Sequence, residues 1–172
     1  MKKIVTAFLC ALLLSALPVL AAQPDALPSA VSETPDWHLL GKQAFEQGKY
    51  EAAAEHFNRA AAIAETPVDM AKALYGKGVT LGQLQRSEEA IAVCNEVVKR
   101  YGDAPEAATR EHVVKAMGNK GFRLGQLQRS EEAIAVYDEV VKRYGDAPEA
   151  GTNGTVARVL ILKNLLQRDR LD

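Results

Sequence analysis

Nucleophilic catalysis needs a serine or cysteine close to a base, and the chain offers few candidates. Beyond residue 22 its serines are Ser29, Ser32, Ser87 and Ser130. The first two lie in a proline-rich stretch. The last two lie where a predicted helix begins and a hydroxyl can cap free amide groups. The chain contains no glycine-rich phosphate loop and no nucleophile elbow, so we predict that it is not an enzyme.

Metal binding would need several ligands brought together on one helix face or in one loop. The three histidines, His38, His56 and His112, are scattered, and none has a second ligand at helical spacing. We interpret each as a histidine of the surface or of a binding groove. The sequence therefore predicts no metal and no other cofactor.

The two cysteines do not predict a disulfide. Cys10 lies in the apolar segment that opens the chain, so Cys94 is the only thiol left once that segment is removed. Cys94 falls on the predicted packed face of a helix. We expect a small buried hydrophobic side chain there rather than a reactive thiol.

The first 22 residues have the layout of a secretory signal peptide. Residues 1–3 are Met-Lys-Lys, residues 4–17 are almost entirely apolar, and the segment ends in Ala21-Ala22. We predict cleavage near Ala22 and a periplasmic or secreted protein of a bacterial envelope, with no membrane attachment after cleavage. The alternative is a retained anchor, because residues 4–22 are just long enough to span a bilayer. Residues 23–35 contain three prolines and predict a flexible linker.

The charge of the chain argues against nucleic acid as a partner. Without Lys2 and Lys3, 19 of the 21 basic residues remain against 22 acidic ones, a net charge of −3. No basic stripe stands out along the chain, and phosphate binding needs one.

An internal repeat determines the organisation of the rest. The segment 78–107 aligns with 121–150 over 30 positions, of which only four differ. Apolar residues recur three and four apart throughout, which indicates helices. A duplicated helical unit buries its apolar face by stacking on its own copy, so the repeat predicts a solenoid.

Turn residues place the helices within one unit. Asp103, Pro105 and Glu106 predict a helix that Asp103 caps and that runs to about Gln126. Ser130 is expected to cap the next helix, which ends at Gly145.

The pattern resembles the tetratricopeptide repeat, an array of antiparallel helix pairs. In the first unit, the residues that carry the resemblance are Trp37, Leu40, Gly41, Gly48, Lys49, Tyr50, Ala53, Phe57, Ala60 and Pro67. The resemblance implies an all-α, right-handed superhelix of about three and a half units and seven helices. We place the units at 36–67, 68–102 and 103–145, and a C-terminal capping helix at 146–172. The 43-residue period exceeds the usual one, which we assign to longer first helices.

The same resemblance implies that the first helices line a concave groove. On its wall we expect the following residues: Lys42, Lys72, Tyr75, Val79, Gln83, Lys115, Asn119, Phe122 and Gln126. His38 and Glu46 belong to the same face. Gly76 and Asn119 depart from the set that clamps a terminal carboxylate in chaperone-binding members. The implied function is a non-catalytic scaffold or adaptor that binds a protein or peptide segment; the alternatives are a structural self-assembling subunit or an accessory factor to an envelope enzyme.

The last helix has more apolar side chains than one packed face requires. We predict that it begins at Thr155 after a break at Gly151–Gly154, and that Val156, Val159 and Leu160 pack inward. Ile161, Leu162 and Leu165 would then form an exposed patch. Exposed contiguous patches mark interfaces, so we predict a homodimer through this helix. The alternative is that the tail 167–172 or the third unit covers the patch.

Overall fold

The computed structural model describes residues 35–147 and 150–168. These residues form helices and no strand, which confirms the all-α prediction. The helices are α1 (Trp37–Glu46), α2 (Tyr50–Ala62), α3 (Pro67–Gln83), α4 (Ser87–Tyr101), α5 (Ala107–Gln126), α6 (Ser130–Tyr144) and α7 (Ala150–Arg168). The predicted signal peptide, and the linker as far as residue 34, lie outside the described residues. Within the described ranges, no helix has both the length and the hydropathy of a membrane span.

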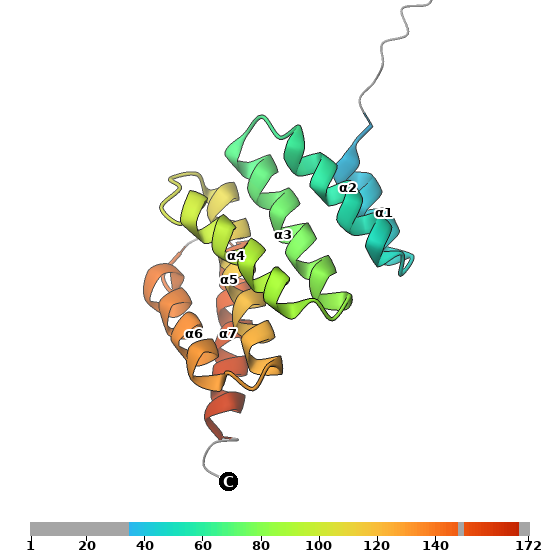
Figure 1. Cartoon of the computed structure of the whole chain (residues 1–172). Helices are drawn as coiled ribbons and strands as arrows, with labels where there is room; N and C mark the ends of the chain where they lie inside the picture. The colour runs from blue at the N-terminus through green and yellow to red at the C-terminus, as the bar shows by residue number, and fades with distance from the viewer. Residues whose placement is uncertain (1–34, 148–149, 169–172) are drawn as a thin grey trace, which may run out of the picture. The chain divides into compact units, whose positions relative to one another are not determined.

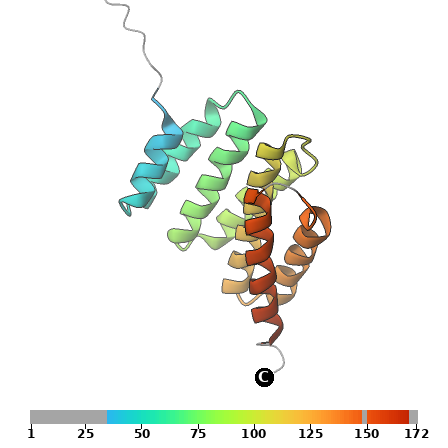
Figure 2. The ribbon, with the colours of Figure 1, turned by 180° about the vertical axis from the view of Figure 1, so that it is seen from behind.

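The helices form three consecutive pairs, α1–α2, α3–α4 and α5–α6, followed by α7. Each helix packs on the next along the chain, and α3, α5 and α7 also contact one another in order. Figure 1 shows α2, α4 and α6 toward the viewer, and from behind, in Figure 2, α1, α3 and α7 are in front. First helices therefore make one face of the stack and second helices the other.

A glycine on each first helix meets a larger side chain sixteen residues later on its partner helix. A Cβ added to Gly121 would lie 2.2 Å from Tyr137 Cε1, and one added to Gly41 would lie 2.9 Å from Phe57 Cδ1. The equivalent Gly78 faces Cys94, with 3.3 Å to the sulfur. The glycines let the paired helices approach closely, as the small residues of the repeat predicted.

The ring of Phe57 also links the first pair to the next. Ala44, Ala53 and Phe57 form a small core of their own, separate from the main core over α3 to α7. A Cβ at Gly76 on α3 would lie 2.6 Å from Phe57 Cε1. The same ring therefore packs against glycines of both α1 and α3.

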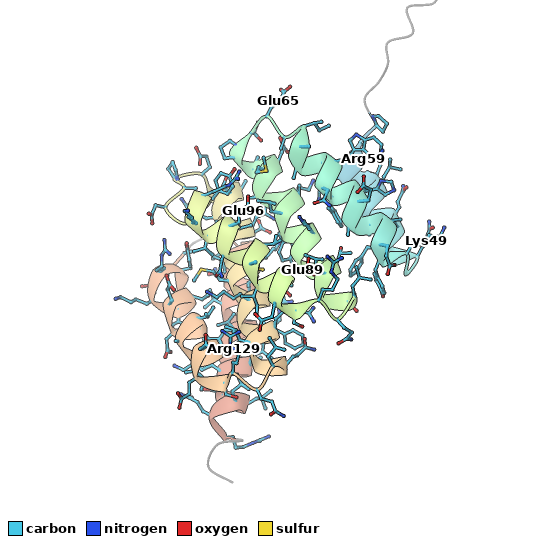
Figure 3. All side chains as sticks on the ribbon, viewed as in Figure 1. Lys49, Arg59, Glu65, Glu89, Glu96 and Arg129 are labelled. Carbon is cyan, nitrogen blue, oxygen red and sulfur yellow. The ribbon has the colours of Figure 1, made fainter. Side chains whose placement is uncertain are left out.

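Arginines join successive second helices on the outer face. Arg129 Nη1 donates to Glu88 Oε1 at 3.1 Å, and Arg143 Nη2 donates to the Gly102 carbonyl and to Asp103 Oδ1, both at 2.7 Å. Figure 3 shows the charged side chains of this face, with Arg129 near the start of α6. Such exposed pairs stabilise the stack only weakly.

The predicted capping roles of Asp103 and Ser130 are wrong. The residue before α5 is Glu106, which makes no cap hydrogen bond, and Asp103 pairs with Arg143 instead. Ser130 is the first residue of α6, and the capping position is Arg129. The carboxylate of Asp103 binds Arg143 of the following second helix, and no local sequence pattern reveals a contact between residues so far apart.

The predicted start of the last helix is also wrong. Helix α7 begins at Ala150 and includes the glycine-rich segment that we expected to break it. Packing on α5 explains this: a Cβ at Gly151 would lie 2.3 Å from Glu111 Cδ, and Thr152 is fully buried. Glycine here permits contact between helices rather than ending one.

The inward face of α7 differs from the prediction at two positions, Leu160 and Leu162. Val156 and Val159 are buried as expected, but Leu160 is 39% exposed, while Leu162 and Leu166 pack against the core. Leu162 therefore does not belong to the exposed patch. With Leu162 inward, the large exposed apolar side chains of α7 are Leu160, Ile161 and Leu165.

Cys94 is 1% exposed and free. Burial raises the pKa of its thiol to about 11, so the side chain stays a neutral thiol at physiological pH. Its environment is that of a buried hydrophobic residue, as predicted.

We expect Gly121→Ala to lower the free energy of unfolding by about 1–3 kcal/mol, because the new methyl group overlaps the buried ring of Tyr137. Gly154→Ala is the matched control, since Gly154 is also helical and has nothing within 4 Å of an added Cβ. That change should stabilise by about 0.5–1 kcal/mol through helix propensity alone. Urea unfolding followed by circular dichroism measures both. Equal effects in the two variants would contradict the close-approach explanation.

Candidate binding groove

Two adjoining clefts run along the face formed by the first helices. The first, cleft A, has a volume of about 220 Å³ and is lined by His38, Lys42, Phe45, Phe57, Lys72, Tyr75, Gly76, Val79 and His112. The second, cleft B, has a volume of about 320 Å³ and is lined by Tyr75, Val79, Lys115, Gly118, Asn119, Phe122, Thr155, Arg158, Val159 and Leu162. Tyr75 and Val79 belong to both, so the clefts adjoin, and we refer to them together as the groove.

Most of the groove residues expected from the sequence lie around these clefts. Lys42, Lys72, Tyr75, Val79, Lys115, Asn119 and Phe122 line one or both. Gln83 and Gln126 line neither: they are the last residues of α3 and α5, both exposed. Gln126 Oε1 instead accepts a hydrogen bond from Arg123 Nη1 at 2.7 Å. That the lining residues bind a partner remains a prediction.

The sequence reasoning missed the contribution of α7 to cleft B. Thr155, Arg158, Val159 and Leu162 line it together. Their spacing of three and four residues places them on one helix face, and this signal was present in the sequence. It was overlooked because Leu162 was expected to point outward. Phe45 and Phe57 of cleft A and Gly118 of cleft B were also missed, whereas His112 fits its interpretation as a surface or groove histidine.

The charged side chains that line the groove are all basic. Lys42 and Lys72 line cleft A, and Lys115 and Arg158 line cleft B. Lys115 pairs with Glu111, and Lys42 lies 3.8 Å from Glu46, but neither carboxylate lines a cleft. The walls are otherwise largely apolar.

Two aromatic side chains meet where the clefts join. The rings of Tyr75 and His112 lie 6.3 Å apart. Burial raises the pKa of Tyr75, and the nearby Lys115 and Arg158 act against that rise. Burial, and then Lys115, lower the pKa of His112 to about 4. His112 is therefore neutral at pH 7, and its buried Nδ1 has no hydrogen-bond partner among the described residues.

The composition of the groove is that of a binding surface. No three histidine, cysteine or carboxylate side chains gather into a metal site within the described ranges. The groove offers aromatic and aliphatic walls with a few cations, the usual composition of a ligand-binding surface.

We expect His112 to make stability depend on pH. In the unfolded chain His112 takes up a proton near pH 6.5, but in the folded protein only near pH 4. Stability is therefore complete above pH 6.5 and is lost as the pH falls from 6.5 toward 4. Between pH 7 and 5, the free energy of unfolding should fall by about 1 kcal/mol less in His112→Phe than in wild type, as measured by urea unfolding. The difference is kept this small because the ring is partly exposed. Equal losses in the two proteins would contradict the buried neutral state.

Residues 38–105 match a family model for the tetratricopeptide repeat. The match runs from α1 through α4, and the repeat extends the same pattern into α5 and α6. A search of curated proteins finds no match. Tetratricopeptide repeats generally mediate protein–protein interactions and are typically non-catalytic. The match, together with the stacked helix pairs, supports a tetratricopeptide repeat family and identifies the fold as an all-α solenoid of that type.

Proposed function

We propose that the protein is a non-catalytic interaction module of a bacterial envelope, which binds an extended segment of a protein or peptide in the groove. The observation that carries this proposal is that clefts A and B adjoin and together extend across α1, α3, α5 and α7. A groove that crosses several helices suits an extended chain better than a small molecule. Its location rests on the predicted signal peptide, and a retained anchor would place the same groove at the membrane.

The groove contains an exposed aromatic side chain that a partner can bury. Phe122 is 40% exposed on the wall of cleft B, beside the partly buried Tyr75. Burial of an aromatic side chain of this kind contributes a large share of binding free energy at protein interfaces. Part of the wall of cleft B is supplied by α7, which packs on α5 and α6.

A second candidate function is self-association through the outer face of α7. Leu160, Ile161 and Leu165 are 39%, 61% and 42% exposed. Helices α1, α3 and α5 each pack against a following helix, whereas α7 packs only on α5 and α6 within the described residues. A second copy of α7, related by twofold symmetry, can cover this face with the same side chains. This proposal revises the predicted patch by replacing Leu162 with Leu160.

We expect Phe122→Ala to reduce binding of partner proteins captured from an envelope extract by at least about tenfold, as loss of a central aromatic contact does. Ile63→Ala is the matched control, because Ile63 is also exposed but lines neither cleft. Capture by the two variants is compared with wild type after circular dichroism has shown equal helix content. Undiminished capture by Phe122→Ala and by Tyr75→Ala/Phe122→Ala would remove the groove proposal.

We expect the protein to be a dimer at micromolar concentration and Ile161→Glu/Leu165→Glu to be a monomer, because two charges would have to be buried. Light scattering measures both. Lys99→Glu serves as the control, because Lys99 is exposed on α4, and it should leave the dimer intact. A monomeric wild-type protein would exclude self-association through this face.

A further inference from the structure

The groove has a basic character that the overall charge of the chain does not suggest. The whole chain has a net charge of −1, yet four cations and no carboxylate line the two clefts. Apolar walls strengthen the field of such charges, because they exclude water from around them. A partner with negative charge is therefore favoured.

Two of these cations have no carboxylate partner among the residues that the structure describes. Lys42 and Lys115 each face a glutamate on their own helix. Lys72 and Arg158 make no ion pair within the described ranges. An arginine that lines an apolar cleft without an anion is well suited to bind a carboxylate with paired hydrogen bonds.

The charges of other nearby carboxylates limit where an acidic group can bind. The carboxylates of Asp36 and Asp69 lie within electrostatic reach of His38, which lines cleft A. Asp36 accepts a hydrogen bond from the Leu39 amide at 2.9 Å, and Asp69 accepts one from Thr66 Oγ1 at 2.6 Å. Asp36 caps α1 and Asp69 lies in the first turn of α3, so an acidic ligand is disfavoured there and favoured toward cleft B.

At the junction of the clefts, a tyrosine hydroxyl adds a hydrogen-bond donor to the cations. Tyr75 lines both clefts and lies within electrostatic reach of Lys115 and Arg158. Its hydroxyl makes no hydrogen bond among the described residues, so it is available to donate. Apolar side chains flank this point on both sides, namely Phe45 and Phe57 in cleft A and Phe122, Val159 and Leu162 in cleft B.

We propose that the bound segment carries an internal aspartate or glutamate, flanked by apolar residues, whose carboxylate binds Arg158, Lys115 and the Tyr75 hydroxyl at the junction of the clefts. The carboxylate is internal because the groove continues on both sides of the junction. The apolar flanking side chains fill cleft A and cleft B. This inference rests on the proposed function of the groove and adds the chemistry of its partner.

Selection from short random peptides tests the proposal without a known partner. The peptides are displayed with their C-terminus fused to a coat protein, which removes the free terminal carboxylate. The bait is the full-length gene product as purified from the producing cell, whether or not that cell removes the predicted signal peptide. We expect selected peptides to share one acidic residue between apolar ones, and binding to weaken as salt is raised.

Synthetic, end-blocked versions of the selected peptides then locate the acidic contact. Replacing their acidic residue with its amide should weaken binding about tenfold, and Arg158→Gln in the protein should do the same. Combined, the two changes should weaken binding little more than either change alone, because each of them removes the same contact between the acidic residue and Arg158. Lys99→Gln is the control, because it removes one exposed positive charge on α4 away from the groove.

The outcomes separate this inference from the proposed function. Selected peptides without an acidic residue, whose binding Tyr75→Ala/Phe122→Ala still abolishes, would overturn the inference and leave groove binding intact. Equal loss in Arg158→Gln and Lys99→Gln would overturn it as well. If no selected peptide depends on Tyr75 or Phe122, both proposals fail.

Discussion

The arrangement of this protein depends on how closely two helices of a pair can approach. Gly41, Gly78 and Gly121 each place bare backbone against the side chain sixteen residues ahead. A methyl group at Gly121 would meet the ring of Tyr137, which is fully buried and has no room to move. Because this contact recurs at each pair, the first helices come to lie side by side, and the clefts form between their exposed faces.

The four differences between the near-identical repeats fit the same pair of helices to different neighbouring side chains. Tyr137 fills the place of Cys94, and Phe122 replaces Val79 on the groove wall. Arg123 replaces Thr80 and lies over Gly82, where a Cβ would be 2.2 Å from its Cζ. Asp138 replaces Asn95 and pairs with Lys163 of α7. Three of the changes alter contacts within the stack, and one changes the surface offered to a partner.

The sequence predicted the helices and their stacking well, because both follow from local signals that the repeat presents more than once. It failed where a distant residue decides the outcome. Asp103 pairs with Arg143, forty residues away, and Gly151 remains helical because Glu111 packs against it. Leu162 was misplaced because an apolar helix has no polar face to fix its rotation, and the side that packs is chosen by α5 and α6. Most of the groove was predictable because the first helices line it at regular spacing, and the part contributed by α7 was lost with that rotation.

Cleft B is lined by α3, α5 and α7 alone, without a side chain from a second helix. Apart from Phe57, every side chain that lines clefts A and B comes from α1, α3, α5 or α7. The second helices set the spacing of the first ones and stay on the far face. A single helix is therefore enough to complete cleft B, with Val159 buried and Arg158 left at the wall. Ile161 and Leu165 are exposed and line neither cleft, but each lies three residues after a groove residue, Arg158 and Leu162, so the proposed dimer surface of α7 adjoins the groove.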